Sequence, residues 1–111
     1  MSNVYFDGFN DREHMLSQFS YGATLPEGAE VLFAAYGLEE DYCGDALIVY
    51  RHGGKLYEVN ASHCSCNGLE VWAPEETDIE SIAIRELYNY YSPEAIAGLK
   101  AMVEKVRSEN E

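Results

Sequence analysis

The middle of the chain carries short apolar runs bounded by glycine, a pattern that predicts β-strands. Residues 31–36 form one such run, and its length favours a strand over a helix. Residues 46–51 are rich in β-branched and aromatic side chains, and residues 56–60 repeat this character. His52-Gly53-Gly54 forms a glycine turn between these two segments. The spacing predicts a tight β-hairpin at the centre of the protein.

Alternation of apolar and other residues predicts one more strand over residues 69–73. Leu69, Val71 and Ala73 have the period of two that places side chains on one side of a sheet. Pro74 follows and lacks the backbone donor that a strand needs, so the strand is expected to end there. The middle of the chain is therefore expected to supply about four strands.

A short helix is predicted near the N-terminus. Asn10 and Glu13 have the spacing of a capping box, in which each side chain bonds a backbone N–H of the other residue. Met15, Leu16 and Phe19 follow at helical spacing and form a narrow apolar stripe. Residues 1–9 before it are expected to form a polar and aromatic arm.

Two further helices are predicted in the final third. Thr77 and Glu80 have the spacing of a second capping box, and Ser92 with Pro93 is typical of an N-cap and first helical position. Acidic residues suited to the positive end of a helix dipole surround the first of these starts: Glu75, Glu76 and Asp78. The apolar stripes are Ile79, Ile82, Ala83, Leu87 and Ile96, Leu99, Val103, Val106. Gly98 weakens the last helix by about 1 kcal/mol relative to alanine, so this helix is expected to depend on docking.

These elements predict an α+β fold in a single domain over residues 1–111. An antiparallel sheet of about four strands with a central hairpin would carry the short N-terminal helix and the two C-terminal helices, packed on one face. Within it we expect the arm at 1–9, the first helix at 10–20, the sheet at 30–73 and the helical part at 77–107.

The charge of the chain excludes two classes of partner. The 111 residues include 20 acidic and 7 basic ones, for a net charge of −13. Nucleic acid and anionic membrane surfaces carry the same sign, so unaided binding to either is not expected. The sequence has no apolar run near the ~18–20 residues of a membrane span, and it starts with neither a basic nor an apolar leader. A cytosolic location follows as the expectation.

Three cysteines, an odd number without an export signal, predict reduced thiols or a metal site and not a disulfide framework. Zinc takes about four nitrogen and sulfur ligands, which Cys64 and Cys66 can supply together with Cys43, with His63 or with His52. The alternative is that the thiols are small buried hydrophobes and that His63 makes a structural hydrogen bond.

A thiol enzyme is the third interpretation of the same cluster. Such a nucleophile needs a base within about 3 Å, and apart from His63 only His14 and His52 are available. No glycine elbow or oxyanion signature accompanies the cysteines. We therefore predict no catalytic residues.

Several motifs together resemble a family of small acidic proteins encoded by phages and prophages. They are Glu40-Asp41-Tyr42-Cys43-Gly44-Asp45-Ala46, Gly54-Lys55-Leu56-Tyr57-Glu58-Val59, Ser62-His63-Cys64-Ser65-Cys66-Asn67-Gly68-Leu69-Glu70, then Trp72 and Pro74-Glu75. The resemblance covers roughly residues 30 to 85, and the S-H-C-S-C-x-G-L-E string is its specific part. It implies a phage origin and no particular reaction. It also implies an accessory role, in which a protein binds and blocks a host or anti-phage-defence protein in the host cytosol.

The acidic loop before the hairpin is the predicted partner-binding site. Glu39, Glu40, Asp41 and Asp45 gather around Tyr42, whose context is exposed. Carboxylates displayed there can occupy a basic groove built for phosphates, as an anti-CRISPR-like mimic of nucleic acid does. The alternative is that these charges only keep the chain soluble. A homodimer is a further expectation, because the helix stripes and tyrosines can bury against a second copy.

Overall fold

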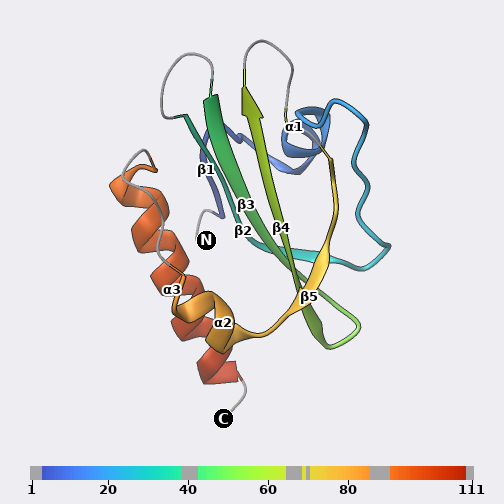
Figure 1. The fold of residues 1–111 in the computed structure, drawn as a ribbon. Coiled ribbons are helices and arrows are strands. Elements are labelled where there is room, and N and C mark those ends of the chain that lie inside the picture. The colour runs from blue at the N-terminus through green and yellow to red at the C-terminus, as the bar shows by residue number, and fades with distance from the viewer. Residues whose placement is uncertain (1–3, 39–42, 65–68, 70, 86–90, 110–111) are drawn as a thin grey trace.

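The computed structural model describes residues 4–38, 43–64, 69, 71–85 and 91–109, with Leu38, Cys43, His63 and Cys64 described in their backbone alone. It confirms the α+β class, with a sheet that carries a short N-terminal helix and two C-terminal helices (Figure 1). The elements in chain order are β1 (Tyr5–Asp7), α1 (Arg12–Ser17), β2 (Glu30–Leu38), β3 (Cys43–His52), β4 (Lys55–Cys64), β5 (Glu75–Thr77), α2 (Ile79–Ala83) and α3 (Pro93–Glu109). No helix among the described residues has both the length and the apolar character needed to cross a membrane.

The five strands form one sheet in the order β1-β2-β3-β4-β5. β1 runs parallel to β2, and the other neighbours are antiparallel. The predicted central hairpin is confirmed: β3 and β4 pair continuously from Cys43↔Cys64 to His52↔Lys55. The turn between them uses Gly53 and Gly54 at φ 61° and 78°, a backbone region that disfavours residues with a Cβ.

The two edges of the sheet differ from the expectation. Residues 5–7, expected as an arm, form β1 at one edge. The strand predicted over 69–73 is wrong for the part of that segment that the structure describes, where Leu69 makes only an isolated parallel bridge to Phe19. Trp72 packs edge-on against Phe19 with 5.0 Å between ring centroids. Leu69 and Trp72 thus pack in the layer that contains α1, whereas Val71 and Ala73 are exposed, and the edge of β4 is taken by β5 instead.

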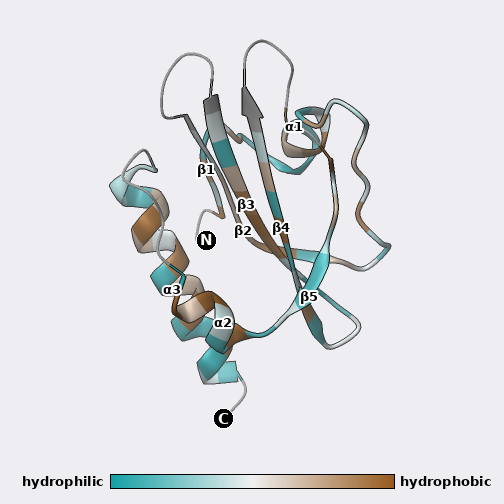
Figure 2. Cartoon of the chain, in the orientation of Figure 1, coloured by the Kyte–Doolittle hydropathy of each residue, from teal (hydrophilic) through white to brown (hydrophobic). Residues whose placement is uncertain are grey.

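Apolar side chains cover both faces of the sheet, so the expectation that all helices pack on one face is wrong. Phe33, Leu47 and Val49 face the buried side chains of α2 and α3. Ile48, Tyr50 and Val59 face the opposite layer, which includes residues of α1. Neighbouring residues of β3 thus point to different cores, which explains why the central strands are continuous apolar runs without alternation. Figure 2 shows this apolar character along β3 and on the inner side of α3.

The helix starts agree only partly with the predicted caps. Ser92 does cap α3, because its Oγ accepts the N–H of Ala95 at 3.0 Å. The other two N-caps lie one residue later than predicted: Asp11 accepts from the His14 N–H and Asp78 from the Ser81 N–H, each at 2.8 Å. Aspartate is as good a cap as asparagine and better than threonine, so neighbouring cap residues compete for the position.

The long helix α3 docks closely on the sheet, as its internal glycine predicts. A Cβ at Gly98 would lie 2.4 Å from the ring tip of Phe6, a residue of β1. The Phe6 ring in turn lies 5.6 Å from the ring of Phe33 on β2. The missing side chain at Gly98 therefore lets the aromatic pair fit between α3 and the sheet.

Candidate functional site

The predicted partner-binding residues are described only at their C-terminal end. Glu39, Glu40, Asp41 and Tyr42 lie outside the described residues. Asp45 is half-buried in β3, where the register sets it opposite Gly37 of β2 and Ser62 of β4. The last β2–β3 pair is Leu38↔Gly44. The strands that enter and leave residues 39–42 are therefore held by a continuous ladder.

Two more carboxylates lie at the same end of the sheet. Asp7 ends β1 opposite Tyr36, and its side chain accepts the backbone N–H of Ser92 at 3.2 Å. Glu94 stands two residues further on, in the first turn of α3. Strand spacing puts the backbones of Asp7 and Asp45 about 10 Å apart, because β2 lies between them. We call Asp7, Asp45 and Glu94 the carboxylate end.

Lysine and arginine are absent from the described backbone segments nearest the carboxylate end. The segments that meet there are 7–8, 36–38, 43–46, 61–64 and 92–94, and none contains lysine or arginine. Four of the seven basic residues of the chain instead form ion pairs elsewhere: Arg51, Lys55, Arg85 and Arg107. These four cations are therefore used in contacts away from this group of carboxylates.

Arg51 shows where one of these cations is used. It lies at the opposite end of β3 and bridges Glu30 at 2.8 Å and Glu109 at 3.1 Å. The hydrogen bond from Arg51 lowers the pKa of the Glu30 carboxyl, against the smaller opposing effect of burial. Arg51 thus ties the start of β2 to the C-terminal end of α3. It is a structural cation and takes no part in the carboxylate end.

The acidic residues expected around the start of the second helix, residues 75–80, make contacts within the fold. Glu75 and Glu76 lie in β5, so the prediction that they flank a helix terminus is corrected to a strand. Glu76 pairs with Lys55 at 3.4 Å across the β4–β5 ladder. Glu80 receives two hydrogen bonds from Arg107, at 2.6 and 3.0 Å, which tie α2 to α3. Most of this run therefore stabilises the fold.

Glu58 is the one buried charged residue among those described, and sequence reasoning missed it. Its carboxylate accepts from Arg85 and from Asn60, both at 2.6 Å. Burial raises the pKa of Glu58, but hydrogen bonds from Arg85, Asn60 and Thr77 together outweigh burial and lower it overall. Arg85 also donates to Asn60 at 3.0 Å. This network fixes the segment after α2 against β4. Glu58 could have been identified as its centre only from the register between β4 and β5.

The predicted zinc ligands meet at the end of the hairpin as far as the backbone shows. The register sets Cys43 directly opposite Cys64, with His63 next to it opposite Gly44. Cys66 lies outside the described residues. The side chains that the structure describes include no group of three or more His, Cys, Asp or Glu placed to hold a metal.

His52 is excluded as a ligand of this cysteine cluster. It is nine residues from Cys43 along a continuous strand, which corresponds to about 30 Å. Its Nε2 lies 3.1 Å from the backbone oxygen of Glu27 at the opposite end of the sheet. The same separation removes His52 as a base for a cysteine nucleophile.

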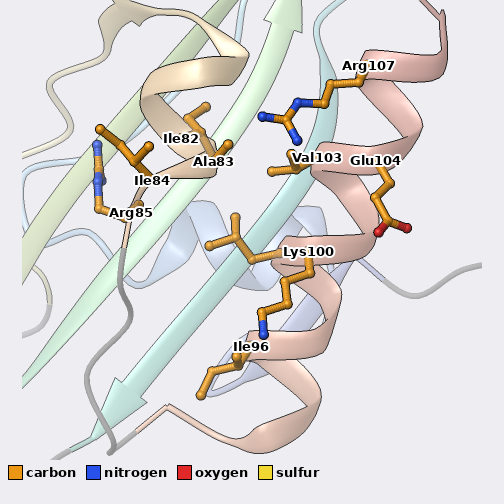
Figure 3. A pocket seen from close by; sticks show the side chains of 10 residues that line it. Ile82, Ala83, Ile84, Arg85, Ile96, Lys100, Val103, Glu104 and Arg107 are labelled. Carbon is orange, nitrogen blue, oxygen red and sulfur yellow. The ribbon is translucent and has the colours of Figure 1, made fainter.

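A cavity of about 560 Å³ lies between α2 and α3. Its apolar wall comes from Ile82, Leu99 and Val103, which are nearly completely buried, and Figure 3 shows it open between the two helices. Helical periodicity predicts each apolar stripe, but it carries no signal for the gap between the two helices. The residues that line it are Ile82, Ala83, Ile84, Arg85, Ile96, Leu99, Lys100, Val103, Glu104 and Arg107.

No family model, curated protein or solved structure matches the chain.

Proposed function

We propose that this chain is a non-enzymatic phage or prophage accessory protein that binds a host or anti-phage-defence protein in the host cytosol. The binding site is the acidic loop at residues 39–42 together with Asp45, and the partner surface is basic. The observation that supports this proposal is the carboxylate end, where described acidic residues gather from three elements without a lysine or arginine. The family resemblance supports the accessory role.

The physical basis is electrostatic complementarity with a surface that normally binds phosphates. At physiological ionic strength the Debye length is about 8 Å, so each carboxylate acts mainly on the partner cations that dock within that distance of it. A partner lined with lysine and arginine is steered to this end and loses affinity as salt rises. Because β2 and β3 are already paired on either side of the loop, they lose little conformational entropy when a partner binds.

The test compares two triple variants with the same change in net charge. The first, Glu39→Gln with Glu40→Gln and Asp41→Asn, removes the loop charges. The matched control, Glu13→Gln with Glu27→Gln and Glu75→Gln, removes three exposed charges that form no ion pair with a described residue. A partner is first captured from host lysate with the tagged native chain at low salt, and its affinity for each variant is then measured over a salt series.

The expected result is a steep loss of affinity and a flatter salt dependence for the loop variant only. Urea denaturation of both variants checks that the fold persists. Equal losses of affinity in the two triple variants would show that only the net charge matters. Unchanged affinity of the loop variant would contradict the proposed site.

A structural zinc site is the second candidate, favoured by the Cys43↔Cys64 register. Directly opposed residues of antiparallel strands have Cα atoms about 4.5–5.5 Å apart, which suits two ligands of one ion. Cys66 and one further ligand would complete the set, because His63 precedes Cys64 directly in β4 and so belongs to the other face of the sheet. Elemental analysis of protein purified without chelator should then give one zinc per chain, and EDTA should lower the Tm. A zinc-free protein whose Tm does not change in EDTA would contradict this candidate, and a Cys43→Ser variant tests the strand-opposed ligand.

A further inference from the structure

The α2–α3 cavity has an exposed apolar residue at its edge. Ile84, just after α2, lines the cavity and is 82 % exposed. Figure 3 shows it across the cavity from Ile96 and Lys100 of α3. The other exposed large hydrophobic residues in the described part of the chain are Tyr21, at 82 %, and Val71, at 56 %, and neither lines the cavity. One face of the molecule thus carries both a projecting aliphatic side chain and an apolar hollow.

The charge of this face differs from that of the molecule. Arg85, Lys100 and Arg107 line the cavity, so it has three of the seven cations of the chain. Three carboxylates accompany them, because Arg85 pairs with Glu58, Arg107 pairs with Glu80, and Glu104 lies on the wall itself. The face is formally neutral on a chain of charge −13. This face therefore attracts a basic partner less than the rest of the molecule does, and it adds no local like-charge contact to the overall repulsion between two chains of −13.

We propose that this face is the contact between two copies of the chain. A twofold axis beside Ile84 brings the Ile84 side chain of each copy over the hollow between α2 and α3 of the other. Such an interface is self-complementary and closes at the dimer. Burial of the exposed isoleucine on both sides supplies the driving force. Asp7, Asp45 and Glu94 do not line the cavity, so the two proposed contacts use different residues.

The test measures mass against protein concentration by sedimentation equilibrium, at low and at raised salt. The native chain should pass from monomer to dimer and go no further. Raised salt should strengthen the dimer, because it screens the repulsion between two chains of −13; binding of a basic partner would show the opposite salt dependence.

Two variants with equal charge changes locate the contact. Ile84→Asp should raise the dimer Kd at least about tenfold, since it replaces the buried aliphatic group by a carboxylate. Tyr21→Asp is the matched control: Tyr21 is also 82 % exposed but follows α1, in the layer on the other face of the sheet. It should leave the Kd within about twofold. A native chain that stays monomeric at all concentrations, growth beyond a dimer, or equal effects of the two variants would overturn the proposal.

Discussion

Gly98→Ala should destabilise the protein although it places a better helix former inside a helix. In an open helix the change stabilises by about 1 kcal/mol. Here the new Cβ would lie 2.4 Å from Cζ and 2.6 Å from Cε2 of Phe6, distances that require the ring to move. Because the Phe6 ring also contacts Phe33, forced repacking costs about 1–3 kcal/mol. The net expectation is a loss of up to about 2 kcal/mol.

A double-mutant cycle isolates this contact. Phe6→Leu removes the ring atoms that the Cβ would meet, so in that background Gly98→Ala should stabilise by about 1 kcal/mol. The coupling energy is then about 1–3 kcal/mol. The neighbouring exposed position supplies the control, since Ala97→Gly should cost about 1 kcal/mol in both backgrounds. Urea denaturation at one low protein concentration, followed by the fluorescence of the single tryptophan Trp72, measures all variants. If Gly98→Ala stabilises the native chain as much as the Phe6→Leu chain, the close approach of α3 to β1 is wrong.

Two further predictions concern the polar contacts of the fold. Glu58→Gln should lower the free energy of unfolding at pH 7 by about 2–3 kcal/mol, because it weakens charged hydrogen bonds at a buried site. Since the fold lowers the pKa of Glu58, its contribution is complete above the usual value of 4.5 and is lost as the pH falls below it, so the variant should lose less stability than the native chain in acid. Asp11→Ala should cost about 1 kcal/mol and Asn10→Ala less than about 0.5 kcal/mol, as urea titrations can resolve, because Asp11 is the N-cap. A larger loss of stability in Asn10→Ala than in Asp11→Ala would show that Asn10, and not Asp11, is the N-cap.

The elements that sequence reasoning found are those with a local cause. The hairpin needs two residues at positive φ between β-rich segments, and Gly53 and Gly54 satisfy this requirement within four residues of chain. The start of α3 is equally local, since Ser92 and Pro93 define it without help from the rest of the fold. The apolar stripe of α3 is confirmed for Leu99, Val103 and Val106, which are buried.

The elements that it missed depend on a neighbour far away in the sequence. β1 has only three residues, and they form a strand because the edge of β2 offers the pairing Phe6↔Ala35. β5 is Glu75-Glu76-Thr77, two residues that disfavour strands followed by one that favours them. It forms beside β4 because Lys55 pairs with Glu76 and because Thr77 donates to the buried Glu58. The pairing of β1 with β2 and the pairing of β5 with β4 can be identified only when the register of the sheet is known.

The candidate sites also depend on contacts between residues that are distant in the sequence. Composition alone gives a surplus of 13 negative charges but not their positions. The fold decides the positions, because it pairs Arg51 with α3 and β2, and Arg107 with α2, at sites remote from the β2–β3 connection. Asp45 and Asp7 keep their carboxylates at the other end of the same sheet.

One consequence of this separation is that the two proposed contacts respond oppositely to salt. The carboxylate end attracts a basic surface, so rising ionic strength weakens that complex. The neutral face between α2 and α3 joins like-charged molecules through apolar burial, so rising ionic strength strengthens that contact. Ile84→Asp adds negative charge and acts on the second contact only, whereas the triple variant at residues 39–41 removes charge from the first. A single salt series on the native chain and these two variants therefore assigns each association to its own surface.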